Sequence, residues 1–184
     1  YEQMDDLTGK AIVLYNLIEG LLLQRKFDDI ASHLPEWEKA VAAAGEVTIE
    51  GDLYRIKGIL ALQDNNYLVA EKFLLKSKAI YNAHNLAYYA MLSDLALLEM
   101  PFKQGNMQLA KQKLVSIEGD VNTYAKAMHL IVYYQLATDI YKNLKEYDLA
   151  FKYAENLKRE QLLLAEKNNG IEILKLEYQQ FLKE

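Results

Sequence analysis

The chain has 184 residues, of which 52% are hydrophobic and 26% are charged, and its formal net charge is -5. These proportions are typical of a folded protein and exclude a disordered chain. The acidic balance argues against general nucleic-acid binding, because neutralising phosphates requires a surplus of clustered cations. The absence of cysteine excludes disulfides, thiolate metal sites and cysteine nucleophiles.

The spacing of apolar residues predicts an all-α fold, which two prolines and eight glycines leave largely uninterrupted. We expect a ragged entry over the first eight residues, then six helices, then two more that meet at a polar corner. Pro35 predicts a kink or restart near Leu34, and Pro101 predicts that the fifth helix stops near Met100. The expected helices cover about 10–23, 27–44, 49–63, 67–81, 86–100, 107–117 and the stretches on either side of the corner at 142–146.

The helices come in pairs, because one pattern recurs at a period close to 40 residues. In each copy a short polar corner precedes a large apolar residue, and further apolar residues follow three and seven positions later. Three columns that keep register through four copies predict four helical hairpins. The large apolar residues are Phe27, Tyr67, Met107 and Tyr147. The later columns hold Ile30, Ala70, Ala110 and Ala150, and then Leu34, Leu74, Leu114 and Ala154.

This pattern resembles the tetratricopeptide repeat (TPR) family, which has a small residue midway along its first helix, an aromatic starting its second, and alanine three residues later. The matching triplets are Gly58, Tyr67 and Ala70, and Thr138, Tyr147 and Ala150. The resemblance implies a right-handed α-α superhelix, a TPR-like solenoid of four helical hairpins with a C-terminal extra helix. The period is longer than usual for the family, Ile30 replaces an expected alanine, and Pro101 disturbs the third copy. We expect a repeat domain over residues 1–166 and a capping or connector helix over 167–184.

The last predicted segment follows Asn168, Asn169 and Gly170, which we expect to interrupt the preceding helix. Its apolar residues recur at three- and four-residue steps, the spacing of a coiled coil. They are Ile171, Leu174, Tyr178 and Phe181. Two interpretations stay open: a helix that forms a homodimer through these residues, or a cap over the last repeat. A helix that leaves a repeat array in this way also resembles the connectors between TPR sensor regions and dimeric bacterial kinases or diguanylate cyclases.

No set of residues predicts catalysis, a metal site or a cofactor site. His33, His84 and His129 fall in different hairpins, and none has a second ligand at metal-binding spacing. No glycine-rich phosphate loop is present, and the paired carboxylates lie near helix starts, where the helix dipole explains them. We therefore expect a protein that is not an enzyme and has no cofactor.

No apolar run is long enough to span a bilayer, so we expect no membrane insertion in this stretch of chain. Because the chain begins at Tyr1 instead of methionine, we expect a piece of a longer protein. The compartment stays open between the bacterial cytoplasm and the periplasm.

The resemblance to TPR proteins implies that a protein or peptide segment lies across the first helices, which line the concave face. The lysine and asparagine clamp that binds terminal carboxylates in chaperone-binding TPR proteins is missing. Because Arg55 and Lys142 face a larger number of carboxylates there, we predict a ligand that is neutral or basic and partly apolar. The alternative is a face of solvated polar residues without a ligand. The expected residues are Tyr15, Glu19, Asp52, Arg55, Ile59, Leu95, Glu99, Gln135, Asp139 and Lys142.

Two classes of function fit these expectations. The first is a non-catalytic binding module, the sensor or scaffold region of a larger bacterial signalling protein such as a diguanylate cyclase or histidine kinase. The second is the ligand-binding domain of a peptide-responsive transcription regulator. A DNA-binding segment before Tyr1 would favour the second class, and an output domain after Glu184 would favour the first.

Overall fold

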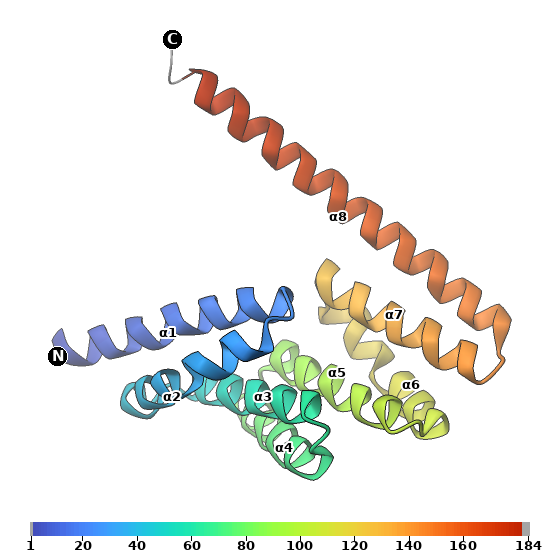
Figure 1. Cartoon of the computed structure of the whole chain (residues 1–184), viewed down its shortest axis with the longest axis horizontal. Helices are drawn as coiled ribbons and strands as arrows, with labels where there is room; N and C mark the ends of the chain where they lie inside the picture. The colour runs from blue at the N-terminus through green and yellow to red at the C-terminus, as the bar shows by residue number, and fades with distance from the viewer. Residues whose placement is uncertain (1, 182–184) are drawn as a thin grey trace. The chain divides into compact units, whose positions relative to one another are not determined.

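The structure, a computed structural model, describes the backbone of residues 2–181 and the side chains of residues 8–171. Within this part of the chain every regular element is an α-helix, and no strand is present. The helices follow one another in four pairs joined by short turns (Figure 1), which confirms the predicted all-α fold of helical hairpins. They are α1 (Glu2–Leu23), α2 (Phe27–Ala44), α3 (Val47–Gln63), α4 (Tyr67–Ala83), α5 (Ala87–Lys103), α6 (Met107–Tyr124), α7 (Ala127–Asn143) and α8 (Tyr147–Phe181).

The chain divides into two compact units, Tyr1–Met100 and Pro101–Glu184. In the first unit α1 packs on α2, α2 on α3, and α3 on α4. In the second unit α6 packs on α7, and α7 packs on α8. Within each unit, therefore, consecutive helices pack in the order of a helical-repeat solenoid.

The 40-residue register is confirmed by the points at which the second helices begin. The helices α2, α4, α6 and α8 start at Phe27, Tyr67, Met107 and Tyr147. The residue three positions later is buried in every copy, as expected where two helix backbones approach closely. These buried residues are Ile30, Ala70, Ala110 and Ala150.

The turn inside each hairpin has the same backbone structure in all four copies. One residue adopts a left-handed conformation and donates its N–H to the carbonyl three positions back. The next residue donates its N–H to the carbonyl five positions back. This is the Schellman pattern, which satisfies the last carbonyls of a helix while the chain reverses. The left-handed residues recur with the period of the sequence and are Arg25, Asn65, Gly105 and Lys145.

Replacing Lys145 by glycine should stabilise the protein by about 1 kcal/mol, because a Cβ is unfavourable in the left-handed conformation. Lys145 has a φ of 61°. Urea unfolding followed by circular dichroism measures the change. Lys145→Ala is the matched control, since it shortens the same side chain but keeps the Cβ, and it should give no gain. Equal gains in the two variants would contradict the explanation.

Two glycines lie where helices approach too closely for a side chain. A Cβ on Gly58 of α3 would lie 2.6 Å from Leu74 Cγ and 3.3 Å from the carbonyl oxygen of Ala70, both on α4. A Cβ on Gly51 would lie 2.6 Å from Cε1 of Tyr81. The small residue expected at position 58 is therefore required by the packing of α3 on α4.

Trp37 is fully buried in the first unit. Its Nε1 donates a hydrogen bond to the carbonyl oxygen of Ala11 at 3.1 Å, which ties α2 to α1. Its ring also stacks on the ring of Tyr15, with centroids 6.1 Å apart. Trp37 thus fixes the position of a side chain that was expected on the concave face.

The expected stop near Met100, the expected interruption at residues 168–170 and a restart of the helix at Pro35 are wrong, and the expected ragged entry is helical from Glu2. α2 continues through Pro35, α5 runs past Pro101, and α8 continues through residues 168–170. Pro35 removes the hydrogen bond to the carbonyl of Ala31 and crowds that carbonyl, but Ala31 is an exposed residue of α2. Pro101 lies in the last turn of α5, where few backbone bonds remain to be lost. At 168–170 asparagine and glycine lower helix propensity, by about 1 kcal/mol for glycine, but they keep every backbone donor.

Candidate functional site

Four of the residues expected on the concave face come together in the first unit. Tyr15 and Glu19 belong to α1, and Asp52 and Arg55 belong to α3. Arg55 donates from Nη2 to Glu19 Oε1 and, at 3.2 Å, to Asp52 Oδ1. Tyr15 and Glu19 are four residues apart in α1, so they lie on one face of that helix. Asp52 and Arg55 are three residues apart and share a face of α3 in the same way. One arginine therefore joins two neighbouring first helices.

Two further tyrosines, Tyr81 of α4 and Tyr89 of α5, belong to the same group. The Tyr81 hydroxyl donates to Asp52 Oδ1 at 2.8 Å, and its ring stacks on that of Tyr89 with centroids 5.3 Å apart. The sequence did not predict Tyr81 here, because the resemblance to TPR proteins places second helices on the outside. Its ring reaches Asp52 because Gly51 leaves the necessary space. The Arg55 cluster, as it is called below, consists of Tyr15, Glu19, Asp52, Arg55, Tyr81 and Tyr89.

The charges of the Arg55 cluster are held largely inside the protein. The side chains of Asp52 and Arg55 are each 5% exposed, whereas that of Glu19 is 28% exposed. Burial lowers the pKa of Arg55, but Glu19 and Asp52 outweigh it and raise that pKa above its ordinary value, so Arg55 stays protonated. Burial raises the pKa of Asp52, with Arg55 and Tyr81 opposing the shift. The carboxylates of Glu19 and Asp52 face the single guanidinium of Arg55, so the cluster has one negative charge in excess. Of the two carboxylates, that of Glu19 is the one in contact with solvent.

One donor of the cluster has no acceptor. Arg55 Nε is buried and lacks a hydrogen-bond partner among the described residues. Buried polar atoms of native proteins almost always have a partner. Arg55 Nε is therefore an exception among the buried polar atoms of the cluster.

Two other residues of the first unit that were expected on the concave face lie in its apolar packing instead. Ile59 packs against the hydrophobic core, and Leu95 is only 5% exposed. Glu99 is half-buried on α5. The two aliphatic side chains thus contribute mainly to packing.

Three more of the expected residues lie on α7 in the second unit. Gln135 Nε2 donates to Asp139 Oδ2 at 2.9 Å, and Asn143 Nδ2 donates to the carbonyl oxygen of Asp139. Gln135 and Lys142 are exposed. These are polar side chains on a solvated helix face, and their role as ligand contacts stays a prediction.

A separate group of tyrosines packs α7 against α8 inside the second unit. The ring of Tyr153 stacks on that of Tyr141 at 5.5 Å and lies 6.2 and 6.1 Å from the rings of Tyr133 and Tyr134. The Tyr153 hydroxyl donates to Glu118 Oε1 at 3.0 Å. All four tyrosines are buried, so the group belongs to the core.

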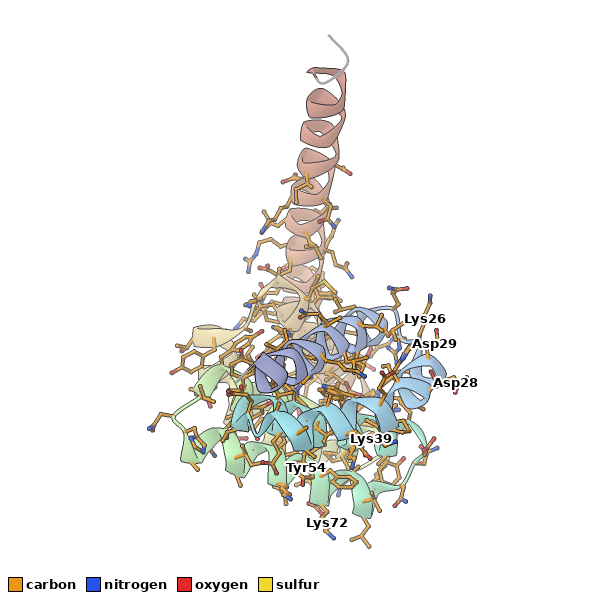
Figure 2. All side chains as sticks on the ribbon, turned by 90° about the vertical axis from the view of Figure 1, so that its left-hand side faces the viewer. Lys26, Asp28, Asp29, Lys39, Tyr54 and Lys72 are labelled. Atoms are coloured by element: carbon orange, nitrogen blue, oxygen red, sulfur yellow. The ribbon has the colours of Figure 1, made fainter. Side chains whose placement is uncertain are left out.

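A hollow of about 420 Å³ opens between α2, α3 and α4. Lys57 lines it, with Nζ 2.5 Å from Glu38 Oε1 and 5.5 Å from the ring centroid of Phe73. Asp28 also lines it and lies near the start of α2, beside the turn from α1 (Figure 2). The other polar residues of the lining are Asp28, Gln63, Asp64 and Asn66, and the rest of the lining is apolar. Its apolar lining consists of Phe27, Ala31, Leu34, Leu60, Ala61, Val69 and Phe73.

Over its described side chains from residue 161 to Ile171, α8 is largely uncovered by the rest of the second unit. In this range every residue is exposed except Leu164, which is half-buried. Ile171 is 43% exposed. α8 extends well past α7 and does not fold back over it, as a capping helix would (Figure 1). The side chains of Leu174, Tyr178 and Phe181 lie outside the described residues, so the homodimer contact stays a prediction.

No group of histidine, aspartate and glutamate side chains in the described part of the chain is arranged to hold a metal ion. Among the described residues, no helix combines the length and apolar character needed to cross a membrane.

The comparisons with known proteins add no assignment. No protein-family model matches the chain, and no curated protein sequence matches it significantly.

Proposed function

We propose that the chain is a non-catalytic module that binds a protein or peptide segment. It would serve as a TPR-like sensor or scaffold region of a larger bacterial signalling protein, such as a diguanylate cyclase or histidine kinase. The Arg55 cluster carries this proposal. It combines charged and aromatic side chains of the first helices α1, α3 and α5 with Tyr81 of α4, beside the face where the resemblance to TPR proteins implies a ligand.

Stability alone is a weak explanation for this cluster. Taking Asp52 and Arg55 out of water is costly, and replacing a buried ion network by apolar residues of similar volume is often neutral or stabilising. The same two helices also carry fully buried isoleucines, Ile18 and Ile56, so apolar packing is available at this interface. A costly polar group that reaches solvent through Glu19 supports a role in recognition.

A catalytic role has less support. Glu19 and Asp52 are both engaged by Arg55, and Asp52 also accepts from Tyr81. The cluster contains no serine, cysteine or histidine that a carboxylate could activate. Held in this way, the carboxylates are suited to positioning and recognition.

Selection from a random dodecapeptide library on the immobilised chain tests the proposal. We expect enriched peptides that are neutral or basic and partly apolar. Their binding should weaken about tenfold or more in Tyr15→Ala, which removes a large ring from the cluster. Circular dichroism confirms that the variant is folded.

The matched control is Leu68→Ser. Leu68 is 81% exposed on α4 and is not a member of the cluster, so this variant should bind the enriched peptides as the unaltered chain does. A library that yields no enriched peptide, or tighter binding to peptides with acidic C-termini, would overturn the proposal.

A further inference from the structure

The Arg55 cluster carries one negative charge in excess, and that charge is accessible. Arg55 occupies Oε1 of Glu19, while the Glu19 side chain keeps 28% of its surface in solvent. A carboxylate with free lone pairs in a partly desolvated setting binds a cation more strongly than one in bulk water does. The charge balance of the cluster therefore favours one additional cationic group.

Aromatic rings lie beside this charge and are already fixed in place. Tyr15 is one four-residue step from Glu19 and is stacked on the ring of Trp37. Tyr89 is held by the ring of Tyr81 on one side and by the edge contact of Tyr88 at 5.0 Å. Tyr89 joins the cluster through Tyr81, whose hydroxyl donates to Asp52 at 2.8 Å. Tyrosine rings attract ammonium and guanidinium groups, and fixed rings lose little entropy on binding.

We infer that the Arg55 cluster receives one lysine or arginine side chain of the bound segment, with its cationic group against Glu19 and beside the rings of Tyr15 and Tyr89. This inference rests on the proposed binding function and specifies its chemistry. Apolar residues of the segment would lie on either side of the basic residue.

The test repeats the dodecapeptide selection on the unaltered chain and on Glu19→Gln and sequences both outputs. The unaltered chain should enrich lysine or arginine at one position of the selected motif. In Glu19→Gln that preference should fall about tenfold or more, because a hydrogen bond to a charged group is lost, while the flanking apolar preferences persist.

The outcomes separate the two proposals. If the unaltered chain enriches no peptide, the binding function itself is overturned. If it enriches peptides without a basic position, or if the basic preference survives in Glu19→Gln, only the present inference is overturned.

Two further measurements test the inference without the Glu19→Gln variant, in case that variant is poorly folded. Tyr89→Leu leaves every charge in place and should weaken binding of a selected peptide more than binding of its copy with norleucine at the basic position. The nitrogen-15 NMR signal of Arg55 Nε–H should shift with the basic peptide and stay unchanged with the norleucine copy. Equal responses to the two peptides would refute the inference.

Discussion

Replacing Arg55 by methionine should lower the free energy of unfolding by about 3–5 kcal/mol, because a buried carboxylate loses its counter-charge. Arg55 is only 5% exposed, and it contacts Asp52, which is equally buried, as well as Glu19. Methionine keeps a similar volume, so the loss of charge dominates over the loss of packing. Urea unfolding followed by circular dichroism measures the difference.

The pH dependence of this loss identifies the group responsible. Burial already holds the pKa of Asp52 above its ordinary value of 3.8, and removing the cation raises it further. A carboxyl whose folded pKa lies above its unfolded pKa gains stability as the pH falls through the folded value. The deficit of Arg55→Met should therefore be largest near neutral pH and shrink as the pH falls towards 3.8.

A matched variant separates charge from volume. Combining Arg55→Met with Glu19→Gln and Asp52→Asn removes all three charges and should recover most of the lost stability near neutral pH. A deficit that does not change with pH, or that remains in full in the triple variant, would show that packing and not charge explains the loss.

Replacing Gly58 by alanine should destabilise the protein by about 1–3 kcal/mol, because the added methyl overpacks a close helix contact. Its Cβ would lie 2.6 Å from Leu74 Cγ, where α3 and α4 must separate or Leu74 must leave its rotamer. Thermal and urea unfolding measure the loss.

Gly20 is the matched control for this substitution. It lies in α1 with nothing within 4 Å of an added Cβ. Gly20→Ala should therefore be neutral or stabilise by up to about 1 kcal/mol, through helix propensity alone. A similar effect of the two substitutions would exclude the close contact at Gly58 as the cause.

The sequence predicts the repeat register well, because large and small apolar residues at fixed steps are dictated by local packing. The starts of α2 and α4 at Phe27 and Tyr67 follow from that pattern. The left-handed conformations in the turns could not be predicted from the residue types, because Arg25 and Lys145 are not residues that typically adopt them. They are recognised from the hydrogen bonds that all four turns share.

Two parts of the structure could not be predicted from the sequence, for different physical reasons. The place of Tyr81 in the Arg55 cluster depends on the space above Gly51, which is a contact between helices and not a property of either one. The continuation of helices through Pro35 and Pro101 depends on how small the local loss is compared with the packing of the whole helix. Spacing predicts which residues share a face, but not how far a long side chain reaches across an interface.

The length of α8 has a mechanical consequence. It has 35 residues, whereas its packing partner α7 has 17, so α8 is longer than α7 by about half of its own length. At 1.5 Å per residue this extra length is roughly 27 Å, and a tilt of about 10° at its base would carry its tip about 5 Å. A small change in the packing angle between α7 and α8, which leaves both helices intact, would thus produce a displacement of several ångströms at the far end of α8.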